Sequence, residues 1–170
     1  NHFPDERTIQ RFSLQNGITV LTFSNLASKS LTIFGMLGSG SAWDSPEKLG
    51  TANFTALMLM RGNERQTFQE INNRLESVGA SLSFSADAMN TWFQGRSLVK
   101  DFRMLLSLIF DNLTKPTFPE EYIERLRKQL LTSILIRDQD TQERASLEFN
   151  KALFYPHPYG VPVEGYAETI

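Results

Sequence analysis

Cysteine is absent from this chain of 170 residues, and histidine occurs only twice, as His2 and His157. The absence of cysteine excludes disulfides, thiolate metal sites and a cysteine nucleophile, and it leaves the cellular compartment open. Two histidines so far apart in the sequence are too few for a site built from imidazole groups. They also disfavour a serine hydrolase, because a serine nucleophile needs a histidine base beside it.

Long apolar runs and an excess of one charge are also missing. No apolar stretch approaches the roughly 20 residues that a membrane-spanning helix needs, so no membrane span is predicted. The 17 basic and 19 acidic residues give a net charge of -2 without a basic tract, which argues against a nucleic-acid partner. The hydrophobic share of 41% and the charged share of 21% are typical of a globular protein, and the length predicts a single domain over residues 1–170.

Strand patterns, either alternating or continuously apolar, cover Thr8–Leu14, Ile18–Phe23, Leu31–Leu37, Leu82–Ala86 and Thr91–Leu98. Asn16-Gly17 separates the first two segments and predicts a hairpin in which both turn residues have positive φ. The continuous apolar character of Leu31–Leu37 predicts a central strand. The last two segments are expected to pair as a second hairpin.

Helical periodicity predicts a helix that starts near Asp44–Glu47, with Pro46 in its first turn. Further helices are expected over Thr67–Val78, over the apolar stripe from Val99 to Leu113, from Pro119 through Ile134, and over Thr141–Phe154. The order of strands, a helix pair, a hairpin and three helices predicts an α+β fold.

The stretch Gly50–Asn63 resembles the signature helix of the insulinase family of zinc metallopeptidases, which includes pitrilysin and the mitochondrial processing peptidase. The family's pattern reads roughly G-L-A-H-F-L-E-H-M-x-F-x-G-T and contains the inverted zinc motif H-x-x-E-H. The frame of that pattern is present as Gly50, Ala52, Phe54, Met58 and Gly62.

Four other segments resemble the family in the same order along the chain. They are the L-x-N-G-x-x-V opening at Leu14–Val20, the loop Gly35–Trp43 followed by Asp44, the P-x-F-P-E-E segment at Pro116–Arg125, and Ala152–Gly160. The resemblance spans residues 8–165. Each segment alone is weakly specific, but their common order makes the resemblance specific.

The residues that would carry the family's chemistry are replaced. Asn53 stands at the first histidine, Ala56 at the glutamate and Leu57 at the second histidine. The family's third ligand, a glutamate about 77 residues after the second histidine, falls at Ile134. A catalytic zinc needs three protein donors and an open position for water, and the glutamate would accept a proton from that water. We therefore predict no zinc and no peptide hydrolysis by this chain alone.

The same replacements predict apolar packing. In the family's fold the long helix meets the signature helix, so Leu57 and Ile134 are expected to be core residues, each contributing roughly 1.5–3 kcal/mol if fully buried. Asn53 is expected to be a buried amide bonded to backbone or water. On the long helix, Arg125, Arg127 and Lys128 are expected to face solvent.

The resemblance implies a sandwich of a mixed, largely antiparallel sheet with flanking helices. It also implies the first subdomain of an inactive half, excised from a longer chain or working beside a separate subunit. In the family, two halves close around a peptide and one half carries zinc. The expected partners are therefore an active, zinc-bearing peptidase-like domain or subunit and a peptide substrate, and zinc is expected only in that partner.

Three alternatives remain open at this point. An active metalloendopeptidase with relocated ligands would need a new cluster of His, Asp or Glu side chains. A structural scaffold subunit, like the core proteins of a respiratory complex, would share the fold without binding substrate. A generic α+β binding module would leave the ordered segment matches unexplained.

Overall fold

The computed structural model describes residues 5–170, so His2 lies outside the described part. The chain divides into two compact units, residues 1–30 and residues 31–170. No helix among the described residues is both long and apolar enough to cross a membrane. The strands are β1 (Gln10–Ser13), β2 (Thr19–Thr22), β3 (Ser30–Leu37), β4 (Gly62–Asn63), β5 (Gln66–Thr67), β6 (Ser81–Ala86) and β7 (Thr91–Leu98). The helices are α1 (Thr51–Met58), α2 (Phe68–Glu76), α3 (Phe102–Thr114), α4 (Glu120–Gln139) and α5 (Thr141–Phe154), accompanied by four short 3-10 turns.

The first unit contains the predicted hairpin, in which β1 and β2 pair antiparallel with Phe12 opposite Val20. The expected two-residue turn is wrong. The Leu14 N–H donates to the Ile18 carbonyl oxygen and the Gly17 N–H to the Leu14 carbonyl oxygen, which closes a three-residue loop. Gly17 adopts a φ of +86° as the left-handed residue that follows the turn, so positive φ is needed at the glycine and not at Asn16.

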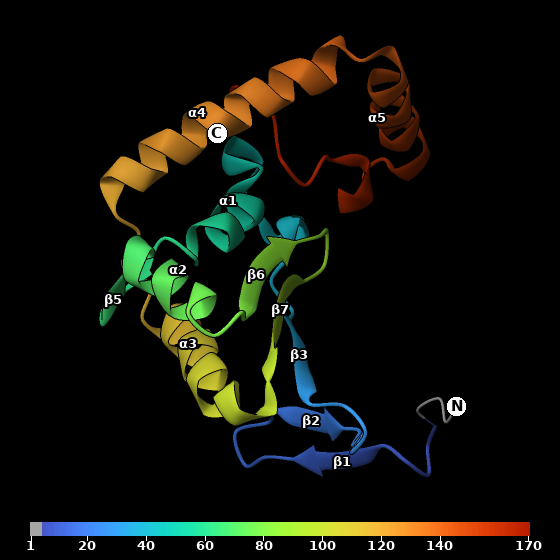
Figure 1. The fold of residues 1–170 in the computed structure, drawn as a ribbon. Helices are drawn as coiled ribbons and strands as arrows, with labels where there is room; N and C mark the ends of the chain where they lie inside the picture. Colours follow the sequence, from blue (N-terminus) through green and yellow to red (C-terminus); the bar gives the residue numbers. More distant parts are fainter. Residues whose placement is uncertain (1–4) are drawn as a thin grey trace. The chain divides into compact units, whose positions relative to one another are not determined.

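The second unit is built on a three-stranded sheet with the order β3-β7-β6 (Figure 1). The predicted β6–β7 hairpin is confirmed as an antiparallel pair. The central position predicted for β3 is wrong, since β3 lies at one edge and β7 lies in the middle. Ile33 of β3 faces the core, whereas Phe34 is 62% exposed and stacks on Trp92 at a ring-centroid distance of 5.1 Å. The continuous apolar run of β3 therefore reflects two apolar faces and not a central position.

Helices α1, α2 and α3 cover one face of this sheet (Figure 1). The main core lies between them and consists of nine buried side chains: Ala56, Leu59, Ile71, Leu75, Leu82, Phe84, Leu105, Leu108 and Ile109. The alternation in β6 sends Leu82 and Phe84 into this core and leaves the intervening serines exposed. The α+β fold with antiparallel pairing is thus confirmed.

A buried polar pair closes the core near the end of α3. The Asn63 side-chain amide donates to the Asn112 Oδ1 atom at 2.7 Å, and Asn112 is fully buried. The Oδ1 atom of Asn63 also accepts from the backbone N–H groups of Arg65 and Gln66, each at 2.9 Å. The Asn112 amide nitrogen donates to the Met60 Sδ atom at 3.6 Å, so both buried amides have partners, and the pair ties the β4–β5 turn to α3.

Candidate functional site

The start of α1 is fixed by a glycine and an aspartate. The predicted helix start near Pro46 is wrong, because Pro46–Lys48 form only a 3-10 turn and α1 begins at Thr51. Gly50 lies between this turn and α1 and has a φ of +97°. A Cβ atom at this position would come within 2.6 Å of the Glu164 carbonyl oxygen. The Asp44 carboxylate accepts hydrogen bonds from the backbone N–H groups of Gly50 and Ala52, each at 3.0 Å. Burial raises the pKa of the Asp44 carboxyl, although these hydrogen bonds act in the opposite direction.

From this fixed start, α1 sends side chains to two sides. In Figure 1, α1 lies between the sheet and α4. Ala56 is 1% exposed and belongs to the main core on the sheet side. Leu57 is half-buried and packs on the side of α4. Ala56 therefore packs against the sheet, whereas its neighbour Leu57 packs against α4.

The contact between α1 and α4 is apolar. Its buried centre is formed by Met58 of α1 and Leu126 and Leu130 of α4. The partly buried side chains around this centre are Phe54, Leu57, Tyr122, Ile123 and Ile170. Ile134, one turn after Leu130 on α4, is 2% exposed. Hydrophobic burial thus joins the two helices.

Asn53 lies one turn before Leu57 and is half-buried. The prediction of a buried amide is wrong, because Asn53 is only half-buried, and its side chain makes no hydrogen bond to any described residue. A half-buried amide can reach solvent, so it does not need a partner within the protein.

The four side chains do not fit a zinc ion. Asn53, Ala56, Leu57 and Ile134 supply one neutral amide and three hydrocarbon groups, whereas zinc in proteins takes imidazole, thiolate or carboxylate donors. Leu57 also packs against the apolar cluster between α1 and α4, and Ile134 is buried. No group of three or more His, Cys, Asp or Glu side chains among the described residues could hold a metal elsewhere. No hydrolytic step through a metal can be derived from these residues.

Comparison with known proteins shows the family of this chain. The sequence profile of the insulinase family, peptidase family M16, matches residues 19–165. The chain belongs to the insulinase family. Across its whole length it is 26% identical to an Arabidopsis thaliana protein named as a probable mitochondrial-processing peptidase subunit beta, of which it covers 32%. It is also 26% identical over 157 residues to an uncharacterized zinc protease of Rickettsia bellii, covering 92% of this chain and 38% of that protein.

Solved structures of this family share the fold. A crystal structure described as a peptidase M16 inactive domain from Pseudomonas fluorescens superposes with a TM-score of 0.89 at 28% identity, covering 95% of this chain and 40% of that one. A protease from Helicobacter pylori gives a TM-score of 0.85 at 15% identity, covering 95% of this chain and 39% of that one, and this second likeness concerns the fold alone. The chain spans about a third of the length of the two curated relatives.

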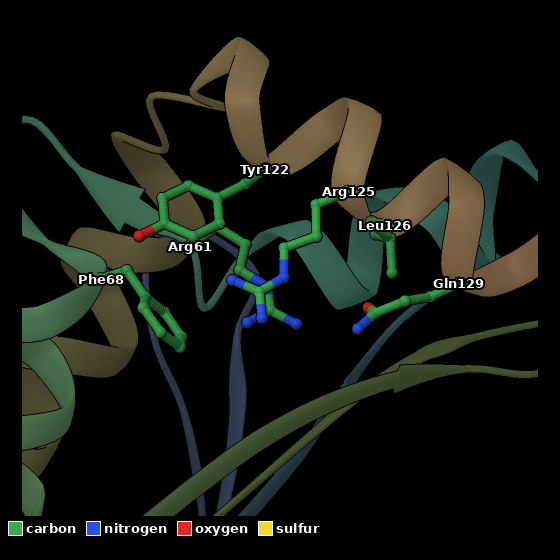
Figure 2. A pocket seen from close by; sticks show the side chains of 6 residues that line it. All are labelled: Arg61, Phe68, Tyr122, Arg125, Leu126 and Gln129. Carbon is green, nitrogen blue, oxygen red and sulfur yellow. The ribbon is translucent and has the colours of Figure 1, made fainter.

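The expectation that the charges of α4 face solvent is only partly right. Lys128 is exposed, but Arg127 donates to the Ile170 carbonyl oxygen and lies 5.8 Å from the centroid of the Phe54 ring. Arg125 is exposed, yet it lines a small cavity together with Arg61 (Figure 2). The sequence places Tyr122, Arg125 and Gln129 on one helix face by their spacing, but it does not show that Arg61 meets them.

Two further residues have capping roles. The Oδ1 atom of Asp140 accepts from the backbone N–H groups of Gln142 and Glu143 at 2.9 and 3.0 Å and so caps α5. The Nδ1 atom of His157 accepts from the Tyr159 N–H at 3.2 Å. His157 is therefore a capping residue of a short turn.

Proposed function

We propose that this chain is a non-catalytic peptidase-like domain of a zinc-dependent metallopeptidase. In this proposal residues 1–170 form the first subdomain of the inactive half, and Asn53, Ala56, Leu57 and Ile134 mark the positions of a lost zinc site. The domain completes the wall of the substrate chamber and contacts the zinc-bearing half. The observation that supports this most strongly is the apolar cluster of Met58, Leu126 and Leu130, in which Leu57 packs where the family's motif has its second histidine.

The peptide-binding part of the proposal rests on β6. Among the described residues β6 pairs only with β7, so its other edge offers free backbone groups. An extended peptide can add to such an edge as a further strand. Many proteins place lysine, proline or a bulge in an edge strand, and these features prevent unwanted pairing with other strands. The sequence of β6, Ser-Leu-Ser-Phe-Ser-Ala, contains neither lysine nor proline.

The register of the hairpin shows which backbone groups of β6 face this edge. The Asp87 N–H donates to the Asn90 carbonyl oxygen at 2.8 Å, so these two residues form a hydrogen-bonded pair. In an antiparallel ladder the next pair, Ala86 with Thr91, is then non-hydrogen-bonded, and its backbone groups point outward. The same alternation turns the N–H and C=O groups of Leu82 and Phe84 to the free edge.

A proline at Ala86 tests this edge. Ala86→Pro removes an outward N–H but leaves the ladder to β7 intact, whereas Ala86→Val keeps the N–H. We expect Ala86→Pro to weaken the binding of an unstructured casein-derived peptide, measured by calorimetry, and Ala86→Val to bind as the wild type does. Hydrogen exchange gives a second readout, because a bound peptide should slow exchange at Leu82, Phe84 and Ala86. Unchanged affinity in Ala86→Pro together with unchanged exchange would contradict edge binding.

Reconstitution tests whether this domain is non-catalytic and works with a zinc-bearing half. The protein is assayed for peptide hydrolysis by itself and after mixing with a relative that has an intact H-x-x-E-H motif. Activity that is raised by mixing, and absent from this chain alone, supports the proposal. Hydrolysis by this chain alone in zinc-free buffer would refute it.

A further inference from the structure

A small cavity opens between the end of α1, the start of α2 and the first turns of α4. It has a volume of roughly 90 Å³ and is lined by Arg61, Phe68, Tyr122, Arg125, Leu126 and Gln129. Figure 2 shows the guanidinium groups of Arg61 and Arg125 turned into the same space, with the Gln129 amide beside it. Two cations therefore share one cavity that contains no carboxylate.

Aromatic side chains hold Arg61 in this position. Its guanidinium carbon lies 4.9 Å from the centroid of the Phe68 ring. Phe68 in turn packs against Tyr122, with the ring centroids 5.2 Å apart. A guanidinium group that stacks on an aromatic face keeps its in-plane N–H donors free for a ligand. Arg61 is therefore positioned in advance and not spread over many rotamers.

Neither arginine has an anionic partner among the described residues. Three carboxylates of neighbouring segments are engaged elsewhere: Glu124 pairs with Arg127 at 3.2 Å, Glu64 with Lys115 at 3.6 Å, and Asp111 with Arg65 at 3.3 Å. The Glu70 carboxylate caps α2 by accepting from the Thr67 N–H at 2.8 Å. The exception is Glu121, one turn before Arg125 on α4, which lines the larger adjoining cavity and forms no ion pair with any described residue.

We propose that the cavity between Arg61 and Arg125 binds the carboxylate group of a peptide. A guanidinium group recognises a carboxylate through two parallel N–H···O bonds, and two such groups can share its two oxygens. The volume of roughly 90 Å³ is several times the roughly 10–15 Å³ that one water molecule needs, so the cavity has room for a carboxylate group. The adjoining cavity of about 460 Å³ shares Arg61, Phe68 and Tyr122 and offers space for the residues next to the bound group.

The carboxylate can come from an acidic side chain or from a free C-terminus. The proposal deepens the peptide-binding role proposed above and rests on it for the source of the ligand. The edge-strand proposal and the carboxylate-site proposal can be refuted independently. Carboxylate binding through both arginines without pairing at β6 would refute only the edge-strand proposal, and the reverse result would refute only the present one.

Nuclear magnetic resonance of the full-length protein tests the proposal through the arginine Nε–Hε signals. The probes are acetyl-Ala-Glu-Ala-amide for a side-chain carboxylate, acetyl-Ala-Ala with a free C-terminus, and neutral acetyl-Ala-Gln-Ala-amide. Inorganic phosphate is titrated in parallel. We expect the signals of Arg61 and Arg125 to shift with at least one carboxylate peptide and not with the neutral one.

Four variants complete the test. Arg61→Gln and Arg125→Gln should each weaken carboxylate binding about tenfold or more, because a bidentate charged partner is lost. Lys128→Gln removes the same charge from an exposed position of α4 and should bind as the wild type does. Glu121→Gln should bind equally well or more tightly. Failure of both carboxylate peptides to bind, binding of phosphate alone, or equal weakening by Lys128→Gln would overturn the proposal.

Discussion

Replacement of Leu130 by alanine tests whether apolar packing joins α1 to α4. Leu130 is 8% exposed and forms the buried centre of the cluster with Met58 and Leu126. The substitution removes three carbon atoms beyond Cβ, each worth about 0.8 kcal/mol of transfer free energy, or about 2.4 kcal/mol together. The cavity that remains raises the expected loss in the free energy of unfolding to about 3 kcal/mol.

Urea denaturation followed by circular dichroism measures this loss. Leu135→Ala is the matched control, because Leu135 lies on the same helix but is 59% exposed. The control should change the free energy of unfolding by less than about 0.5 kcal/mol. If Leu130→Ala and Leu135→Ala were equally mild, the cluster would not stabilise the junction between the two helices, and our explanation of Leu57 would be wrong.

Three further predictions concern the buried polar pair, pH and metal removal. Asn112→Ala should lower the free energy of unfolding by about 1–3 kcal/mol in urea titrations, because the buried Asn63 amide loses its acceptor; a smaller loss would show that the pair is dispensable. Burial acts to raise the pKa of Asp87, but hydrogen bonds from Trp92, Asn90 and Met89 outweigh it and lower that pKa below its ordinary value. A carboxyl with a lowered pKa stabilises the fold above its unfolded-state pKa, and this stability is lost as pH falls through the folded-state pKa. Acidification to about pH 3 should therefore reduce the melting temperature more in the wild type than in Asp87→Asn. A chelator should leave the melting temperature unchanged, whereas a structural zinc would make it fall.

The sequence predicted the element types well because their signals are local. The alternation in β6 and the apolar stripe of α3 each follow from residues that lie close together in the sequence. The assignment of Asn53 and Leu57 to the two histidine positions of the family's motif stays a prediction from the order of the segments.

What the sequence missed depends on contacts between distant segments. The edge position of β3 follows from how β7 pairs, and an apolar run does not distinguish two apolar faces from a central strand. The late start of α1 follows from Gly50 packing against Glu164. The pairing of Asn63 with Asn112 and the shared cavity of Arg61 and Arg125 join residues far apart in the sequence, so no local pattern could indicate them.

Zinc content, measured by mass spectrometry after equilibrium dialysis against zinc and gel filtration, tests the central claim most directly. The wild-type chain is compared with its Asn53→Ala variant and with a zinc-bearing relative that has an intact H-x-x-E-H motif. We predict stoichiometric zinc in the relative and none above background in either form of this chain. One zinc per chain in the wild type that is lost in Asn53→Ala would contradict the account.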